Sequence, residues 1–204
     1  MFIKTLSVFL LLMSTTVMAI EEPNYTVIEQ SEEYELREYD AMIVAEVVVS
    51  GDMDEASSKG FRLIADFIFG NNTANNGTEE EIQMTAPVTI EPHSEKVNMT
   101  KPVTIKEEDG KWRVHFVMPR KYTLESLPIP NNNEVKLRQI PTLKYAVIRF
   151  SGFTGKEKVA EKTTKLMEWM NSKGLTADGL AQLARYNPPW TLPFMRRNEI
   201  MISY

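Results

Sequence analysis

Short groups of residues recur at a fixed distance along this chain and divide it into two similar halves. The recurring residues are Leu36-Arg37, Ala45 and Ser50-Gly51, which return 101 residues later as Leu137-Arg138, Ala146 and Ser151-Gly152. Pro87 returns at the same distance as Pro188. Chance matches at a few positions could imitate a repeat, but the order of the expected elements recurs as well. We therefore expect a duplicated structural unit.

Each half is expected to contain a Leu-Arg strand, an apolar strand, a Ser-Gly turn, a helix and a proline-containing strand. The apolar strands are expected at residues 42–49 and 145–150, and the helices at residues 54–69 and 156–171. Two such units predict an α+β fold. Its form would be a pseudo-twofold, distorted antiparallel β-barrel or saddle with the two main helices packed outside.

The C-terminal stretch combines a proline-rich loop with a final strand. Pro188, Pro189 and Pro193 fix the backbone and remove amide donors, so they predict a rigid loop that is not helical. The apolar and aromatic residues that follow, Ile200, Met201, Ile202 and Tyr204, predict a closing strand. Because Arg196 and Arg197 lie between the loop and this strand, we expect at least one of them to bind a carboxylate or backbone carbonyls that hold the loop.

The first 19 residues have the features of a signal peptide. Lys4 is followed by an apolar run at residues 6–13 that is too short to span a bilayer, and Val17-Met18-Ala19 suits cleavage. The alternative is an uncleaved anchor. With cleavage, residues 20–204 form a single exported domain, periplasmic or secreted, without stable membrane insertion. The chain has no cysteine, which excludes disulfides and a lipid-modified cysteine.

Charge and motifs argue against two classes of function. The chain carries 23 Lys and Arg against 28 Asp and Glu, and this acidic balance argues against nonspecific nucleic-acid binding. No Gly-x-Ser-x-Gly, P-loop, dinucleotide or His-Glu-x-x-His motif is present. The acidic run at residues 79–81 is expected to be a solvated loop. We therefore expect a binding protein and not an enzyme.

The two expected helices differ in the width of their apolar surface. The second has a narrow stripe, which only needs to cover a sheet. In the first, the core-facing stripe is widened by Phe61, Ala65 and Ile68 beyond the arc of about 100° that core packing requires. Such a flank could form a pocket for a flat hydrophobic ligand, or it could pack against a loop of the same chain.

Three motifs resemble those of the SOUL/heme-binding-protein family. They are Gly70-Asn71-Asn72, Met84-Thr85-Ala86-Pro87-Val88, and the stretch from Tyr186 through the prolines to Arg196-Arg197-Asn198-Glu199-Ile200. Their order and spacing extend the resemblance over roughly residues 25–204, as in an exported, bacterial member of the family.

The resemblance implies that heme or a related tetrapyrrole binds in a shallow apolar pocket beside the first helix and the Pro-Pro loop. The implied contacts to the macrocycle are Phe61, Ala65, Ile68, Pro189 and Trp190, with Lys59 or Arg62 near its carboxylates. Asp66 and Thr191 depart from a basic lining of this site.

The implied function is that of a carrier or buffer of the tetrapyrrole. The alternative is an effector-type domain that binds another amphipathic small molecule or a protein partner. His93 and His115 are the only histidines and therefore weak candidates for an iron ligand, so heme would be weakly ligated. A strand histidine such as His115 is more often a structural residue.

Overall fold

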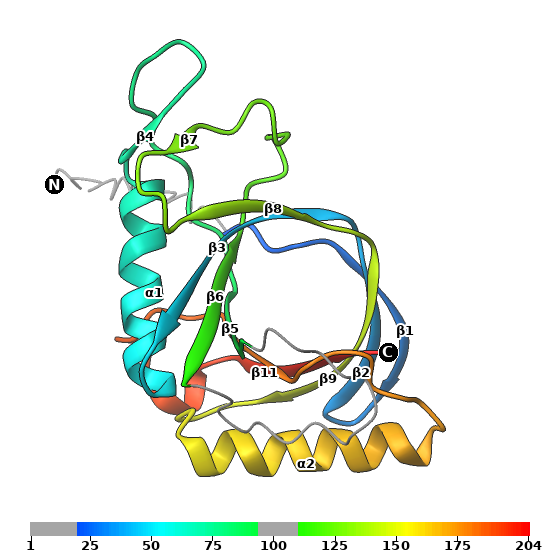
Figure 1. The fold of residues 1–204 in the computed structure, drawn as a ribbon. Coiled ribbons are helices and arrows are strands. Elements are labelled where there is room, and N and C mark those ends of the chain that lie inside the picture. The colour runs from blue at the N-terminus through cyan, green and yellow to red at the C-terminus, as the bar shows by residue number, and fades with distance from the viewer. Residues whose placement is uncertain (1–19, 94–109) are drawn as a thin grey trace, which may run out of the picture.

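The computed structural model describes residues 20–93 and 110–204, and the expected signal peptide lies outside these residues. A nine-stranded antiparallel sheet curls into an open barrel, and two helices pack on its outside, α1 along one side and α2 across another (Figure 1). This α+β architecture confirms the fold class predicted from the sequence. Among the described residues, no helix is both long and apolar enough to cross a bilayer.

In the order of the sheet, the strands are β1 (Tyr25–Ser31), β2 (Tyr34–Tyr39), β9 (Leu143–Phe150), β11 (Asn198–Ser203), β10 (Gln182–Arg185), β5 (Val88–Pro92), β6 (Lys111–Val117), β3 (Met42–Ser50) and β8 (Lys136–Ile140). Two short strands, β4 (Asn72–Thr73) and β7 (Ile129–Pro130), pair separately beyond the C-terminal end of α1. The helices are α1 (Met53–Ile68) and α2 (Lys156–Ser172), and a short 3-10 helix, η1, spans Pro193–Met195. Both α-helices agree with the predicted ranges to within one residue at each end.

Without β1, the order of the strands reads the same from either end of the sheet when each strand is replaced by its equivalent in the other repeat. Exchange of β2 with β8, β3 with β9, β5 with β10 and β6 with β11 reverses the order of the sheet. The register agrees, because Leu36 on β2 lies opposite Ala146 on β9, and Leu137 on β8 lies opposite Ala45 on β3. The predicted pseudo-twofold duplication is therefore confirmed, and each unit contains one strand more than expected.

The turns before the helices follow the repeat, whereas the prolines do not. Gly51 and Gly152 both have positive φ, 135° and 100°, in the turn that leads from an apolar strand into a helix. Pro87 directly precedes β5, but Pro188 follows the end of β10. The predicted equivalence of Pro87 and Pro188 is therefore wrong, because the two residues lie at opposite ends of equivalent strands.

The helix α1 lies unusually close to the sheet. A Cβ atom added at Gly60 would come within 2.6 Å of the side chain of Val114 on β6. Asp52 caps the N-terminus of this helix, because its carboxylate accepts hydrogen bonds from the backbone amides of Asp54 and Glu55. The main apolar core fills the space between the sheet and the two helices. The concave side of the sheet carries a second, smaller apolar cluster together with the buried side chains of Arg37 and Glu199.

Candidate ligand-binding site

The proline-rich loop between β10 and β11 is fixed beside the N-terminal half of α1. Arg185, the last residue of β10, donates hydrogen bonds to the hydroxyls of Ser57 (2.6 Å) and Thr154 (2.9 Å). Its guanidinium also forms an ion pair with Asp54 at 3.3 Å. One side chain thus joins the sheet to the helix and to the turn that precedes α2. The expected proximity of the first helix and the Pro-Pro loop follows from this link.

Arg196 holds the loop from within. Its Nε donates to the carbonyl oxygen of Thr191 (2.8 Å), and its Nη2 donates to that of Pro189 (2.6 Å). The guanidinium also lies 5.4 Å from the ring centroid of Phe153. These contacts confirm the prediction that an arginine fixes the Pro-Pro loop.

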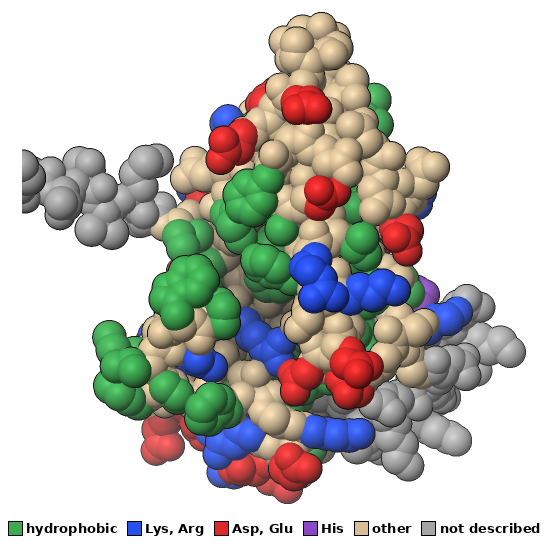
Figure 2. All heavy atoms as spheres, turned by 90° about the vertical axis from the view of Figure 1, so that its left-hand side faces the viewer, with side chains coloured by type: hydrophobic (Ala, Val, Ile, Leu, Met, Phe, Trp, Pro, Cys, Tyr) green, Lys and Arg blue, Asp and Glu red, His purple; other side chains and the backbone are tan. Residues whose placement is uncertain are grey.

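Large apolar side chains are exposed on this loop and on the neighbouring turn. We call them the apolar loop patch, which consists of Phe153, Trp190, Leu192, Phe194 and Met195. Trp190 is the most exposed of them, with 81% of its surface accessible. Figure 2 shows hydrophobic side chains gathered on this face of the molecule, with Lys and Arg side chains between and beside them. An exposed group of this size is typical of a binding surface.

The structure separates the expected contact residues of α1 into two groups. Phe61 is 38% exposed, and its ring packs 5.5 Å from that of Phe116 on β6. Ala65 and Ile68 are buried, Ile68 with only 1% of its surface accessible. In this conformation Ile68 belongs to the core and presents no surface to a ligand.

The expected polar and loop contacts are all accessible. Lys59, Arg62, Pro189 and Trp190 are exposed. Arg62 follows Phe61 directly and lies about 100° from it around the helix, whereas Lys59 lies about 160° away. Arg62 is therefore better placed than Lys59 to meet a carboxylate of a ligand that contacts Phe61.

Both histidines lie on the concave side of the sheet, away from this face. On β6, Val114 and Phe116 point toward α1, so His115 points to the opposite side. Burial lowers the pKa of the His115 imidazole, which is therefore neutral at neutral pH. His93 lies 3.1 Å from the guanidinium of Arg113 on that same side. Neither histidine reaches the apolar loop patch.

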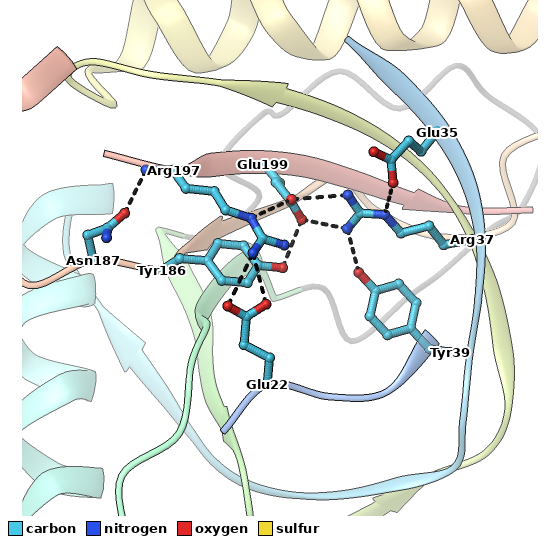
Figure 3. Close-up of polar contacts among 8 residues, drawn as sticks. All are labelled: Glu22, Glu35, Arg37, Tyr39, Tyr186, Asn187, Arg197 and Glu199. Carbon is cyan, nitrogen blue, oxygen red and sulfur yellow. Dashed lines mark hydrogen bonds and ion pairs between the residues drawn. The ribbon is translucent and has the colours of Figure 1, made fainter. Parts of the chain in front are cut away.

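A buried ion pair that the sequence did not reveal lies inside the curve of the sheet (Figure 3). Arg37 on β2 donates two hydrogen bonds to Glu199 on β11, at 2.8 and 3.1 Å. It also donates to Glu35 (2.7 Å) and to the hydroxyl of Tyr39 (2.9 Å). Burial alone would raise the pKa of the Glu199 carboxyl, but the hydrogen bonds and charge of Arg37 hold this pKa below its ordinary value.

Arg197 and Tyr186 complete this cluster. Tyr186 donates its hydroxyl to Glu199 at 2.8 Å, and the guanidinium of Arg197 stacks 3.7 Å from the Tyr186 ring. Arg197 bridges Glu199 to Glu22 in the N-terminal segment. Strand alternation places Glu35, Arg37 and Tyr39 on one side of β2, but it does not identify a partner 162 residues away. The sequence therefore predicts that these three side chains share one side of β2, but it does not predict that Arg37 pairs with Glu199.

The fold is that of an α+β domain, and its exposed apolar face is formed by Phe61 of α1 and the apolar loop patch. The chain belongs to the SOUL heme-binding protein family, whose model matches residues 20–203. Comparison with curated proteins gives no match.

Several solved structures share the fold. The C-terminal domain of EcmrR is 14% identical, with a TM-score of 0.60, and the match covers 88% of this chain and 96% of that one. An uncharacterized conserved protein from Listeria innocua is 15% identical, with a TM-score of 0.60 and coverage of 83% and 91%. A hydrolase from Listeria innocua is 12% identical, with a TM-score of 0.54 and coverage of 86% and 93%. At these identities the likeness concerns the fold alone.

Proposed function

We propose that this protein binds heme or a related tetrapyrrole against the exposed side of α1 and the apolar loop patch, as an exported carrier or buffer. The observation that carries the proposal is the pair of exposed aromatic side chains, Phe61 on α1 and Trp190 on the loop that follows Arg185, the residue that joins β10 to α1. Membership of the SOUL heme-binding protein family supports the choice of ligand. The role is one of binding and not of catalysis.

The residues of this face suit a flat, amphipathic ring. A bound tetrapyrrole would supply a large apolar macrocycle with carboxylates at one edge and, in heme, an iron centre. The apolar loop patch and Phe61 would cover the macrocycle and exclude water from it. Arg62 would pair with a carboxylate, and a guanidinium can do so through two parallel hydrogen bonds. Because both histidines lie on the concave side, contact with the ring and not axial histidine ligation would hold the ligand.

Titration with hemin, followed by visible absorption, tests the proposal. The wild-type protein should bind hemin saturably at micromolar concentration, and Phe61→Asp should weaken the affinity at least about tenfold, because it places a charge where the apolar ring lies. Ile28→Asp is the matched control, since Ile28 is an exposed apolar residue of β1 at the edge of the sheet, and it should bind as wild type does. Absence of saturable binding by the wild type would remove the heme proposal.

Histidine variants give a second readout from the same titration. His93→Ala and His115→Ala should each leave hemin bound with an unchanged Soret position, because neither side chain lies on the proposed face. A large Soret shift in either variant would place the ligand elsewhere on the molecule.

A further inference from the structure

A cavity of about 390 Å³ lies beside the concave side of the sheet, apart from the face of α1. Its walls are the N-terminal segment 21–24, the turn between β2 and β3, and the end of β6 with the loop that follows it. This volume falls within the range of sites that enclose a small organic ligand.

The wall formed by the N-terminal segment is held firmly. Glu21 accepts hydrogen bonds from Nε (3.0 Å) and the backbone amide (2.9 Å) of Arg120, and its carbonyl oxygen accepts from the amide of Ala86 (2.9 Å). On the other side, both carboxylate oxygens of Glu22 accept from Arg197. The N-terminal segment, which forms one wall of the cavity, is therefore anchored on both of its sides.

The cavity is adjacent to a narrow inner space that is lined by a buried histidine. This space of about 30 Å³ shares Pro23, Met42 and Val117 with the main cavity, and His115 lines it. His115 is 6% exposed, and within the described part of the chain its Nδ1 atom has no hydrogen-bond partner. A buried polar nitrogen without a partner is costly, so a ligand that supplied a hydrogen bond there would be stabilised.

The polar groups of the main cavity have an excess of negative charge. Glu21 and Glu22 are neutralised by arginines. Asp40 and Glu125 also line the cavity, and neither forms an ion pair with any residue in the ranges 20–93 and 110–204. The remaining lining is largely apolar and includes Met118.

We propose that this cavity binds a small amphipathic organic cation that carries a hydroxyl group at the end opposite its charge. The ammonium group faces Asp40 and Glu125, the apolar body lies against Met42 and Met118, and the hydroxyl forms a hydrogen bond with His115. This site is separate from the tetrapyrrole face, so neither proposal depends on the other.

Three matched probes test the charge and the hydroxyl by calorimetry on the purified protein. Tyramine carries both groups, 3-(4-hydroxyphenyl)propionate replaces the ammonium with a carboxylate, and phenethylamine lacks the hydroxyl. We expect saturable binding of tyramine, at least about tenfold weaker binding of the acid, and several-fold weaker binding of phenethylamine. Equal binding of the acid, or no saturable binding of tyramine, would overturn the proposal, and equal binding of phenethylamine would overturn the contact with His115.

Variants locate the binding site. Asp40→Asn combined with Glu125→Gln should weaken tyramine binding about fivefold, because exposed charges contribute modestly. Leu124→Arg adds a cation to the lining of the cavity and should abolish binding, and both variants change only exposed residues. Phe61→Asp, on the other face, should bind tyramine as wild type does. Loss of tyramine binding in Phe61→Asp with retention in Leu124→Arg would overturn the location.

The imidazole nitrogens give an independent readout. The chain has two histidines, so His93→Gln assigns the two ring signals in a ¹⁵N NMR spectrum. Tyramine should shift the signal of His115 Nδ1, and an unchanged signal at saturation would overturn the predicted hydrogen bond.

Discussion

Arg37 and Glu199 are 162 residues apart in sequence, yet their side chains form a two-point ion pair with at most 1% of either side chain exposed. Replacing Arg37 with Met should lower the free energy of unfolding by about 3 kcal/mol, because Glu199 would keep only Arg197 and Tyr186 as partners. Arg138→Met is the matched control. Arg138 is the repeat equivalent of Arg37, but it is 43% exposed and pairs with Glu46, so its loss should cost about 1 kcal/mol or less. If urea unfolding showed the same loss of unfolding free energy in Arg37→Met and Arg138→Met, burial would not be the reason why the Arg37–Glu199 pair matters.

The same carboxylate predicts a dependence of stability on pH. Because the pKa of Glu199 is held below its ordinary value of 4.5 in the folded state, the unfolded state takes up this proton more readily. The stabilisation is complete above the unfolded pKa and is lost as the pH falls through the folded pKa. Between about pH 6 and about pH 3, the free energy of unfolding should fall more steeply for the wild type than for Glu199→Gln. Parallel pH profiles from urea titrations would refute this assignment.

Because α1 lies close to the sheet, a methyl group added to the helix at Gly60 should destabilise the protein. Gly60→Ala should destabilise the protein by about 1–3 kcal/mol, because the new Cβ would overlap Val114 unless the helix moved outward. At Gly155, before α2, the nearest atom to an added Cβ is 3.9 Å away. Gly155→Ala should therefore cost less than about 1 kcal/mol. Thermal denaturation distinguishes them, and a similar loss in both variants would mean that α1 can shift freely.

Phe61 and Ile68 should respond differently to the same substitution. Phe61→Asp should keep a cooperative thermal transition, since the side chain is partly exposed. Ile68→Asp would bury an unpaired charge in the core and should abolish the transition or lower its midpoint strongly. Circular dichroism on heating measures both. A folded Ile68→Asp variant would show that this residue can leave the core and would return it to the list of ligand contacts.

Arg196 should matter for binding more than for stability. In Arg196→Ala, the carbonyls of Pro189 and Thr191 lose their donors, so the apolar loop patch should become less ordered before the ligand binds. We expect hemin affinity to fall several-fold with a small change in the thermal midpoint. Arg149→Ala removes an exposed arginine of β9 and serves as the control. A fall in the thermal midpoint as large as that caused by Arg37→Met would instead show that Arg196 mainly stabilises the fold.

The sequence was sufficient for the architecture because that information is local and repeated. Apolar periodicity located α1 and α2, and the recurrence of Leu36 and Ala45 as Leu137 and Ala146 predicted the twofold arrangement of the sheet. The spacing of 101 residues alone did not show which residues are equivalent in the two repeats. Pro87 and Pro188 match in spacing, but they lie at opposite ends of equivalent strands. A chance match in one position is indistinguishable from an inherited one until the strands are paired.

The candidate site was predicted less completely. Helical periodicity placed Phe61 and Ile68 on the same widened arc, but only the packing of the sheet determines that one is exposed and the other buried. The acidic cavity and the buried Arg37–Glu199 pair depend on residues from distant strands. Strand alternation gives the side of the sheet on which a residue lies, but not its neighbours across the curve.

The palindromic strand order has a consequence for each repeat on its own. The first strand of each repeat does not pair with its own unit, since β2 lies against β9 and β8 lies against β3. A single repeat with this geometry would leave its first strand without the partner it has here, and a second copy could supply that partner. Expression of either repeat alone should accordingly give a dimer or an unfolded chain, and not a stable monomeric half.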